Sequence, residues 1–380
     1  MRQNLPLVQL QDLVNTPGHQ HVTARALADP VRVTLPPLAT GQHMLTAMDV
    51  PTGPSGAHWS VEHYTSIGPV LIEFHDVLVH GAAGIVCAGG QLIENTLHQA
   101  SQEQEGWAPL QDRTAWLDLA DDIIRLPGRH LSLLTGSPEN YYHWMMDGIG
   151  RMAATPPNMI ADCTTVLHPA FGQGFQQDSF RRLAVDLPAY PVTSGTTLWV
   201  EHMVVPWSVL GEHLPHPSVV ALFAALAANP PPAPAPGLYP RRLYVDRIAS
   251  KNRHLINEPA LIAALAKIGF VAVRLESLAL SVQIALFAHA DIIVAPHGAG
   301  LTNILFCRPG TKLVEILMDA WAIWCFRRLA ALVGMSYDCV IGLEDRPPDA
   351  PHAAWPHDKD WEVSVPHVLA AVAHGLNGFG

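Results

Sequence analysis

Segments that favour strands and segments that favour helices alternate along the chain from residue 241 to residue 334. The strand-like segments are residues 241–247, 271–276, 291–296 and 312–317, and the helix-like segments are residues 258–269, 281–290, 301–308 and 322–334. Because a helix follows each strand, the strands can lie parallel in one sheet with helices on both faces. The pattern therefore predicts an α/β fold with a Rossmann-like parallel sheet, whose ligands bind at the carboxyl ends of the strands.

The part of the chain before this alternation is more varied. Residues 58–100 contain short apolar runs separated by glycines, which predict a series of β-hairpins. From about residue 127 strands and helices alternate again, and residues 140–155 form a predicted helix. The proline-rich run at 229–237 favours an extended spacer and excludes a helix or a central strand.

These patterns divide the chain of 380 residues into two lobes with additions at each end. The predicted segments are a β-rich segment at 1–125, an α/β lobe at 126–228, a proline-rich linker at 229–237, a Rossmann-like lobe at 238–364 and a C-terminal helix at 365–380. The C-terminal helix is amphipathic, so it could pack back on the N-terminal lobe or form a contact in a homo-oligomer.

Charge and cysteine content indicate which binding partners and which cellular compartment to expect. The formal net charge of −11, from 33 acidic and 22 basic residues, argues against nucleic-acid binding because there is no excess of phosphate-neutralising cations. The five cysteines form no CxxC pair, and an odd number does not close into a disulfide framework, so we expect a reducing compartment. No apolar run approaches the roughly 18 to 20 residues of a transmembrane helix. We expect a cytoplasmic protein, or one that is peripheral at the inner face of the membrane.

The glycine-rich sequence PHGAG at 296–300 follows a predicted strand directly. Gly298 and Gly300 remove two β-carbons at the point where the next helix is expected to begin. Free N–H groups at such a helix start favour a phosphate. The alternative is that the glycines only permit a tight turn between strand and helix.

Four blocks together resemble the signature of glycosyltransferase family 61. HGAGLTN at 297–303 is followed by Phe306, PG at 309–310 and VEI at 314–316. The other blocks are NYYHWMMDGIGRM at 140–152, RRLYVDRIASKNRHLINE at 241–258, and GF at 269–270 leading to Gln283 and Ala290. The resemblance covers about residues 130–320. It implies a GT-B architecture of two Rossmann-like lobes facing a cleft, a nucleotide diphosphate sugar as donor, and transfer with inversion. Bacterial relatives of this length are assigned to capsular or extracellular polysaccharide synthesis.

A departing nucleoside diphosphate needs cations or N–H donors around its phosphates. Arg247 and Arg253 flank a loop after a predicted strand, and planar guanidinium groups suit bidentate phosphate contacts. The alternative is a solvated basic loop. Asp246 departs from the serine common in the family, and an acid near phosphates is unfavourable unless it pairs with one of these arginines.

The resemblance also places the glycine-rich loop and Glu315 on the donor side. The backbone of Gly298, Ala299 and Gly300 would face the phosphates, and His297 could donate to a phosphate or to the sugar, or be held as a structural histidine. Glu315, at the expected strand end, could accept hydrogen bonds from ribose hydroxyls or be an ordinary ion-paired glutamate. Asn303 would contact the nucleotide or, as the simpler interpretation, brace the loop.

Inverting transfer also needs a general base for the acceptor hydroxyl, which can belong to a glycan or a lipid-linked glycan. Asp147 and His143 lie four residues apart on the predicted helix, so they share one face and could act as a base and its orienting partner. Asp147 is the first candidate for the base and His143 the second. Alternatively, the two side chains only satisfy each other in a core.

No metal ligand set stands out, and we expect no cofactor. The sequence DKD at 358–360 matches a metal-binding DxD pattern but follows a loop instead of a strand, and the 21 histidines form no closed zinc pattern. Transfer without a metal ion is therefore expected. Two alternatives remain open: an epimerase or hydrolase that acts on the nucleotide sugar itself, and a non-catalytic subunit that binds the nucleotide sugar.

Overall fold

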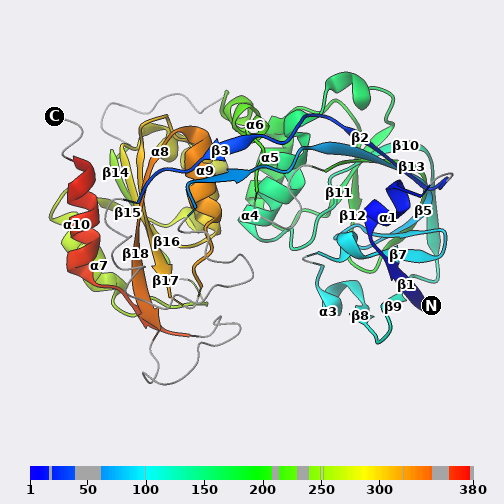
Figure 1. Cartoon of the computed structure of the whole chain (residues 1–380), viewed down its shortest axis with the longest axis horizontal. Coiled ribbons are helices and arrows are strands. Elements are labelled where there is room, and N and C mark those ends of the chain that lie inside the picture. The colour runs from blue at the N-terminus through cyan, green and yellow to red at the C-terminus, as the bar shows by residue number, and fades with distance from the viewer. Residues whose placement is uncertain are drawn as a thin grey trace. The chain divides into compact units, whose positions relative to one another are not determined.

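The computed structural model describes residues 1–16, 19–38, 61–98, 100–207, 214–228, 239–248, 250, 252–319, 321–344 and 359–376. The chain divides into two compact units. Unit 1 comprises Met1–Val31 and Ser66–Leu222, and unit 2 comprises Arg32–Thr65 and Phe223–Gly380. Figure 1 labels their elements. The predicted linker at 229–237 lies outside the described residues.

Unit 2 is built on a parallel sheet. Its strands lie in the order β15-β14-β16-β17-β18-β19, and every neighbouring pair is parallel except β18 with β19. The strands are β14 Arg242–Val245, β15 Val271–Val273, β16 Ile292–Pro296, β17 Lys312–Met318, β18 Ser336–Glu344 and β19 Trp361–Glu362. The chain starts at β14, goes to β15 on one side, and then moves to β16 and beyond on the other. The order therefore reverses between β14 and β16, where open α/β sheets bind their ligands.

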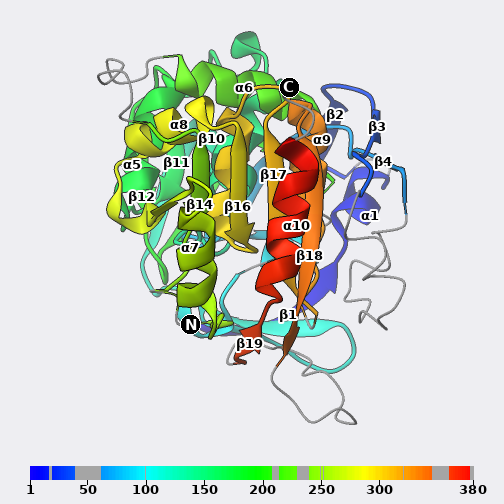
Figure 2. The same ribbon diagram turned by 90° about the vertical axis from the view of Figure 1, so that its left-hand side faces the viewer.

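Helices cover both faces of this sheet, as the sequence predicts. They are α7 Glu258–Ala266, η6 Leu275–Ser277, α8 Leu280–His289, η7 Ala299–Phe306, α9 Cys325–Val333 and α10 Val365–Leu376. Figure 2 shows α7 and α10 side by side on one face. Leu261, Val368 and Val372 from these two helices pack with Val294 and Val314 of the sheet in one core. Because helices lie on both faces, all residues of β17 are buried, which is typical of a central parallel strand.

Unit 1 contains a mixed sheet. Its described residues form 11 strands, of which β12-β11-β10-β13 are parallel neighbours and β13-β5-β6-β7 are antiparallel neighbours. The strands are β1 Arg2–Val8, β2 Val22–Ala26, β5 Val70–His80, β6 Ile85–Ala88, β7 Gln91–Ile93, β8 Trp107–Pro109, β9 Thr114–Asp118, β10 Ile123–Ser132, β11 Thr165–Pro169, β12 Ala189–Val192 and β13 Thr197–Trp207. The predicted hairpins are present as β5, β6 and β7.

Short helices complete unit 1 and join it to unit 2. They are α1 Leu10–Val14, η2 Glu94–Leu97, α3 Gln102–Glu105, α4 Tyr141–His143, η3 Trp144–Gly148, η4 Ile149–Ala154, η5 Pro157–Met159 and α5 Gly174–Leu183, followed by α6 Ser218–Ala227 at the boundary. Leu183 and Phe180 of α5 pack with Leu131 of β10 and Val166 of β11. The predicted alternation after residue 127 therefore corresponds to one edge of a larger sheet.

The structure differs from the predicted division at three places. Residues 1–125 and 126–228 do not form separate domains, because β5 of the first pairs with β13 of the second along almost its whole length. Residues 32–65 belong to unit 2 through β3 Arg32–Thr34 and β4 His63–Thr65. Helix α10, which we expected to pack back on the N-terminal lobe, contacts α7, β17 and β18 within unit 2, because Val368, Ala371 and Val372 complete the core there.

Two further expectations concern the cysteines and membrane segments. All five cysteines are buried and none forms a disulfide bond. In the part of the chain that the structure describes, no helix has the length and apolar character needed to cross a bilayer.

A buried carboxylate in unit 1 gives a prediction about stability. Glu105 is 4% exposed and its Oε1 accepts hydrogen bonds from Ala83 N and Ser194 Oγ, whereas Oε2 has no hydrogen-bond partner in the part of the chain that the structure describes. Burial raises the pKa of Glu105. A carboxyl group with a raised pKa contributes stability that is fully present below its ordinary pKa of 4.5 and is lost as pH rises through the folded-state value.

We therefore expect Glu105→Gln to be more stable than the wild type at pH 8, on the order of 1 kcal/mol, since the variant buries no charge. Urea unfolding between pH 4.5 and pH 8 measures this difference, which should shrink as the pH falls. Glu103→Gln, on the exposed side of the same helix, is the matched control. A difference for Glu105→Gln that does not change with pH would contradict the assignment.

Candidate active site

The two loops at the point of strand reversal in unit 2 are tied together by one arginine. Arg247 follows β14, and its Nη1 donates to the backbone oxygen of His297, which follows β16, at 3.0 Å. A β-carbon on Gly298 would lie 2.1 Å from the same Nη1. The φ of Gly298 is −179°, which any residue adopts, so the glycine is needed for close approach of the guanidinium. The predicted arginine and the glycine-rich loop therefore lie together at the carboxyl edge of the sheet.

The guanidinium of Arg247 is only partly used by the protein. Its Nη2 donates to Ser250 Oγ at 2.7 Å and to Asn252 O at 3.2 Å, in addition to the Nη1 bond to His297. A guanidinium carries five N–H donors. Within the described residues, the remaining two donors have no partner, so they can bind an anionic ligand.

Glu258 fixes the backbone at this arginine. Its Oε1 accepts from the backbone N of Arg247 at 2.8 Å and from the hydroxyl of Tyr244 at 2.8 Å. Glu258 is 1% exposed, and burial raises its pKa. Because Glu258 opens α7, the helix start and the end of β14 are held in one place. Sequence reasoning missed this role, although Glu258 closes the block at 241–258.

Arg253 supplies a second cation beside Arg247. Burial, and then the charge of Arg247, lowers the pKa of Arg253 to about 10. Its guanidinium carbon lies 5.2 Å from the ring centre of Trp321, and its backbone has a φ of 51°. Two neighbouring cations and a left-handed non-glycine residue each cost free energy, and such costs concentrate at functional sites. A diphosphate would offset the repulsion between the two guanidinium groups.

The carboxylate of Asp246 forms an ion pair with Arg274. Its Oδ1 accepts from Arg274 Nε at 3.2 Å. The ion pair directs this carboxylate toward the segment after β15, and so the acid that departs from the family pattern has a cation of its own.

His297 is oriented by a chain of hydrogen bonds. Its Nδ1 lies 2.6 Å from Glu315 Oε1, and Tyr337 donates its hydroxyl to Glu315 Oε2, also at 2.6 Å. Glu315 lies within β17 with none of its surface exposed, and both of its oxygens are engaged. Of the two interpretations of Glu315, an exposed acceptor for ribose hydroxyls or an ion-paired glutamate, the structure has the second: the buried carboxylate pairs with His297 and orients its ring. Nothing in the sequence indicated Tyr337.

The rest of the predicted loop has two roles. Asn303 is fully buried and its Nδ2 donates to Gln283 Oε1 at 2.9 Å and to Gly300 O at 3.1 Å, so it braces the loop. Ala299 and Gly300 are partly exposed and offer backbone groups. They begin η7, which is a 3₁₀ helix and not the expected α-helix.

A second histidine–carboxylate pair lies in unit 1. His143 Nδ1 and Asp147 Oδ2 are 2.7 Å apart, with side-chain exposures of 14% and 9%. The predicted helix at 140–155 is present but irregular, since α4 continues into a π-helical turn, η3, and a 3₁₀ turn, η4. Gly148 allows this, because a β-carbon there would lie 2.9 Å from the ring of Trp144. Such π turns occur frequently at functional sites.

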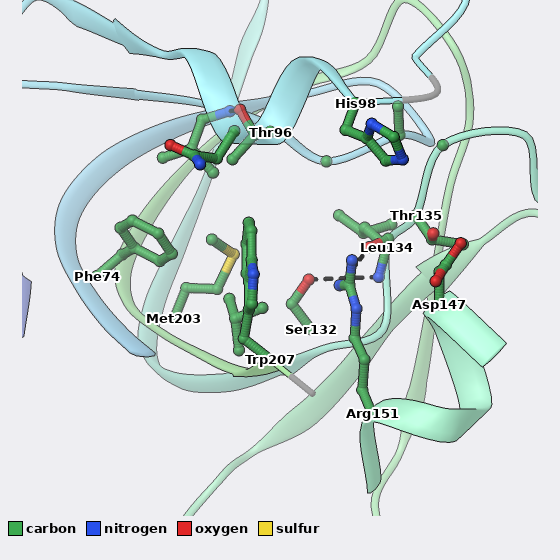
Figure 3. A pocket seen from close by; sticks show the side chains of 16 residues that line it. Phe74, Thr96, His98, Ser132, Leu134, Thr135, Asp147, Arg151, Met203 and Trp207 are labelled. Atoms are coloured by element: carbon green, nitrogen blue, oxygen red, sulfur yellow. Dashed lines mark hydrogen bonds between the residues drawn. The ribbon is translucent and has the colours of Figure 1, made fainter. Parts of the chain in front are cut away.

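Asp147 lines a pocket of unit 1 that Figure 3 shows from close by. Arg151 and Trp207 line the same pocket, with the guanidinium 5.6 Å from the Trp207 ring centre. Arg151 is 6% exposed; its Nη1 donates to Leu134 O at 2.6 Å, and its Nε has no hydrogen-bond partner among the described residues. Burial lowers the pKa of Arg151 to about 10, and the charge of Asp147 acts against that shift. The pocket thus combines a carboxylate, a cation and an aromatic face.

Comparison with known proteins gives one family match that includes both the His143–Asp147 pair of unit 1 and the Arg247 loop of unit 2. Residues 141–314 match the family model described as glycosyltransferase 61. The match begins two residues before His143, includes the Arg247 loop and the glycine-rich loop, and ends one residue before Glu315. The chain is also 34% identical, over 100 residues, to the EGF domain-specific O-linked N-acetylglucosamine transferase of Drosophila melanogaster. That similarity covers 26% of this chain and 19% of the length of the relative.

Proposed function

We propose that the protein is an inverting glycosyltransferase of family 61, which transfers a sugar from a nucleotide diphosphate sugar to a hydroxyl group of a glycan. The observation that carries this proposal is the pair of guanidinium groups at the strand reversal of unit 2, next to the glycine-rich loop and an oriented histidine. The match of residues 141–314 to the family model supports it.

In this proposal unit 2 binds the donor. The two unused N–H donors of Arg247 and the charge of Arg253 stabilise the diphosphate as its negative charge grows. The Nε2 of His297 donates a hydrogen bond to the same leaving group when the ring carries both protons, since Nδ1 then donates to Glu315 and Nε2 has an N–H of its own. The helical turn at Ala299 contributes backbone N–H groups.

Unit 1 provides the base. The acceptor oxygen forms a bond to the anomeric carbon while the bond from that carbon to the diphosphate oxygen breaks, and the hydroxyl proton passes to Asp147. His143 holds the carboxylate in place through its Nδ1. The two units thus act as the donor and acceptor lobes of a GT-B-like enzyme. We propose capsular or extracellular polysaccharide assembly as the process served.

A thermal-shift series tests donor binding. Uridine, guanosine, cytidine and thymidine diphosphate sugars are compared, starting with N-acetylglucosamine donors because the fly relative carries that sugar in its name. A donor at 100 times its Kd stabilises the folded state by about 2.7 kcal/mol. We expect one nucleotide class to raise the melting temperature, with and without EDTA. Nucleoside monophosphates are the control, and they should give a smaller shift because they cannot span both guanidinium groups.

Product analysis then separates transfer from other reactions of the same site. With the bound donor and a panel of glycan acceptors, we expect a new glycosidic bond of inverted configuration. Release of free sugar or an epimer from the donor alone would replace the proposal with a hydrolase or epimerase. If no donor changes the melting temperature, the donor site is wrong.

A further inference from the structure

Two histidines and a glutamate gather on one face of the sheet of unit 1, apart from the residues of the candidate active site. Glu73 and His75 are two residues apart on β5, so their side chains point to the same face. His202 lies on β13 directly opposite His75. The two imidazole rings have centroids 4.2 Å apart, and Glu73 Oε2 lies 2.6 Å from His202 Nε2.

The separations fit a metal ion. One ligand atom from each of the three side chains lies within 4.8 Å of the other two. Tetrahedral zinc with ligand bonds of about 2.0–2.2 Å holds its ligand atoms roughly 3.4 Å apart. Small side-chain rotations would therefore bring all three atoms to one ion. All three residues are partly exposed, so an ion can reach them.

The backbone under the cluster is held firmly. The neighbouring inward-facing residues Phe74 and Val77 of β5 and Met203 of β13 are buried in one core. Asp76, between His75 and Val77, has a φ of 52°, and the pairing of β5 with β13 skips it. This irregularity lets both Phe74 and Val77 face the core, and it leaves His75 on the outer face.

Arg129 acts as the outer partner of the glutamate. Its Nη2 lies 3.3 Å from Glu73 Oε1, and the same guanidinium is paired with Asp162 and donates to Met159 O. Arg129 therefore holds the oxygen that faces away from His202 and leaves Oε2 for an ion. Carboxylates that bind metal ions are commonly fixed in this way by a second hydrogen-bonded group.

We propose that Glu73, His75 and His202 bind a divalent transition-metal ion of the zinc class, with Glu73 Oε2 and His202 Nε2 among the ligand atoms. Imidazole with a single carboxylate suits Zn²⁺ or Co²⁺ and disfavours Mg²⁺ and Ca²⁺, which prefer oxygen ligands. An ion at His202 Nε2 needs that nitrogen free of a proton, so binding replaces the hydrogen bond between His202 and Glu73. Three protein ligands leave a fourth position for water.

The test is Co²⁺ and Zn²⁺ binding to the full-length protein after chelator treatment and dialysis. We expect one tight equivalent by calorimetry, visible absorption typical of tetrahedral Co²⁺, and no binding of Mg²⁺. His75→Ala and His202→Ala should each weaken binding by at least about tenfold. Glu73→Gln, which keeps the size of the side chain, should also weaken it, and circular dichroism should show all variants folded.

His289→Ala is the matched control, because the chain contains 21 histidines that could bind metal ions weakly elsewhere. His289 is an exposed histidine of α8 in unit 2, and its substitution should leave the tight equivalent unchanged. If His202→Ala binds Co²⁺ as tightly as His289→Ala, or if the wild type has no tight equivalent, the proposal is wrong. Sugar-transfer activity is not part of this readout, so the result is independent of the proposed function.

Discussion

Asp147→Asn is expected to retain donor binding and to lose roughly 10²- to 10⁴-fold in the rate of sugar transfer, the usual contribution of a positioned general base. Asparagine has the same shape, and its amide oxygen can still accept the hydrogen bond from His143 Nδ1. The buried surroundings of Arg151 and the turn at Gly148 are therefore preserved. Only the capacity to take a proton is removed. Initial rates at saturating donor give the loss, and the thermal shift with donor confirms binding.

Two comparisons make this prediction specific. Asp178→Asn is the matched control, since Asp178 is a partly exposed acid of α5 in the same unit that pairs only with Arg181 among the described residues. His143→Gln should cost less than Asp147→Asn if His143 only orients the carboxylate. A larger loss for His143→Gln would make His143 Nε2 the base and Asp147 its orienting partner. Full activity of Asp147→Asn would remove both assignments.

The histidine–carboxylate pairs show how far the sequence determines the site. His143 and Asp147 lie four residues apart, and the helical repeat brings them together even though the turn between them is π-helical. The separation of four residues in sequence was therefore enough to predict that these two side chains meet. His297 and Glu315 are 18 residues apart, and their contact depends on β16 and β17 being neighbours in register.

Glu315 shows why the roles of the donor-side residues were harder to predict from the sequence. Its place in an apolar strand was evident, and we expected it at an exposed strand end. The partner that makes burial possible is Tyr337, which reaches it from β18, and the sequence gives no measure of that proximity. A buried carboxylate with both oxygens bonded orients a neighbour, whereas an exposed one binds ligands, and only tertiary contacts distinguish the two.

The same limit applies to the division into units. The alternation of strands and helices predicted the parallel sheet of unit 2, and its helices appear close to the expected residues. The return of residues 32–65 to this unit was not predicted. Arg327 of α9 donates to Pro36 O at 2.8 Å, and Arg328 lies 5.9 Å from the ring centre of Tyr64. Contacts over such a separation in sequence leave no periodic pattern in the chain.

Gly298→Ala is expected to weaken donor binding by roughly 10- to 100-fold, the cost of one charge-assisted hydrogen bond of about 1.5–3 kcal/mol. The new β-carbon would lie 2.1 Å from Nη1 and 3.3 Å from Cζ of Arg247, so the guanidinium must move away from the loop. The extended backbone of Gly298 accepts alanine without strain, which isolates the effect of displacing the arginine. Titration of the donor by calorimetry measures the loss.

Gly300→Ala is the matched control two residues further along the loop. Its β-carbon would meet only the flexible end of Leu275, at 2.8 Å from Cδ1, and the edge of Val245, so Arg247 stays in place. We expect its donor affinity to fall by less than about threefold, and Arg247→Lys to resemble Gly298→Ala because lysine keeps the charge without the planar fork. Equal affinities for Gly298→Ala and Gly300→Ala would mean that the guanidinium only braces the loop and that the phosphates bind elsewhere.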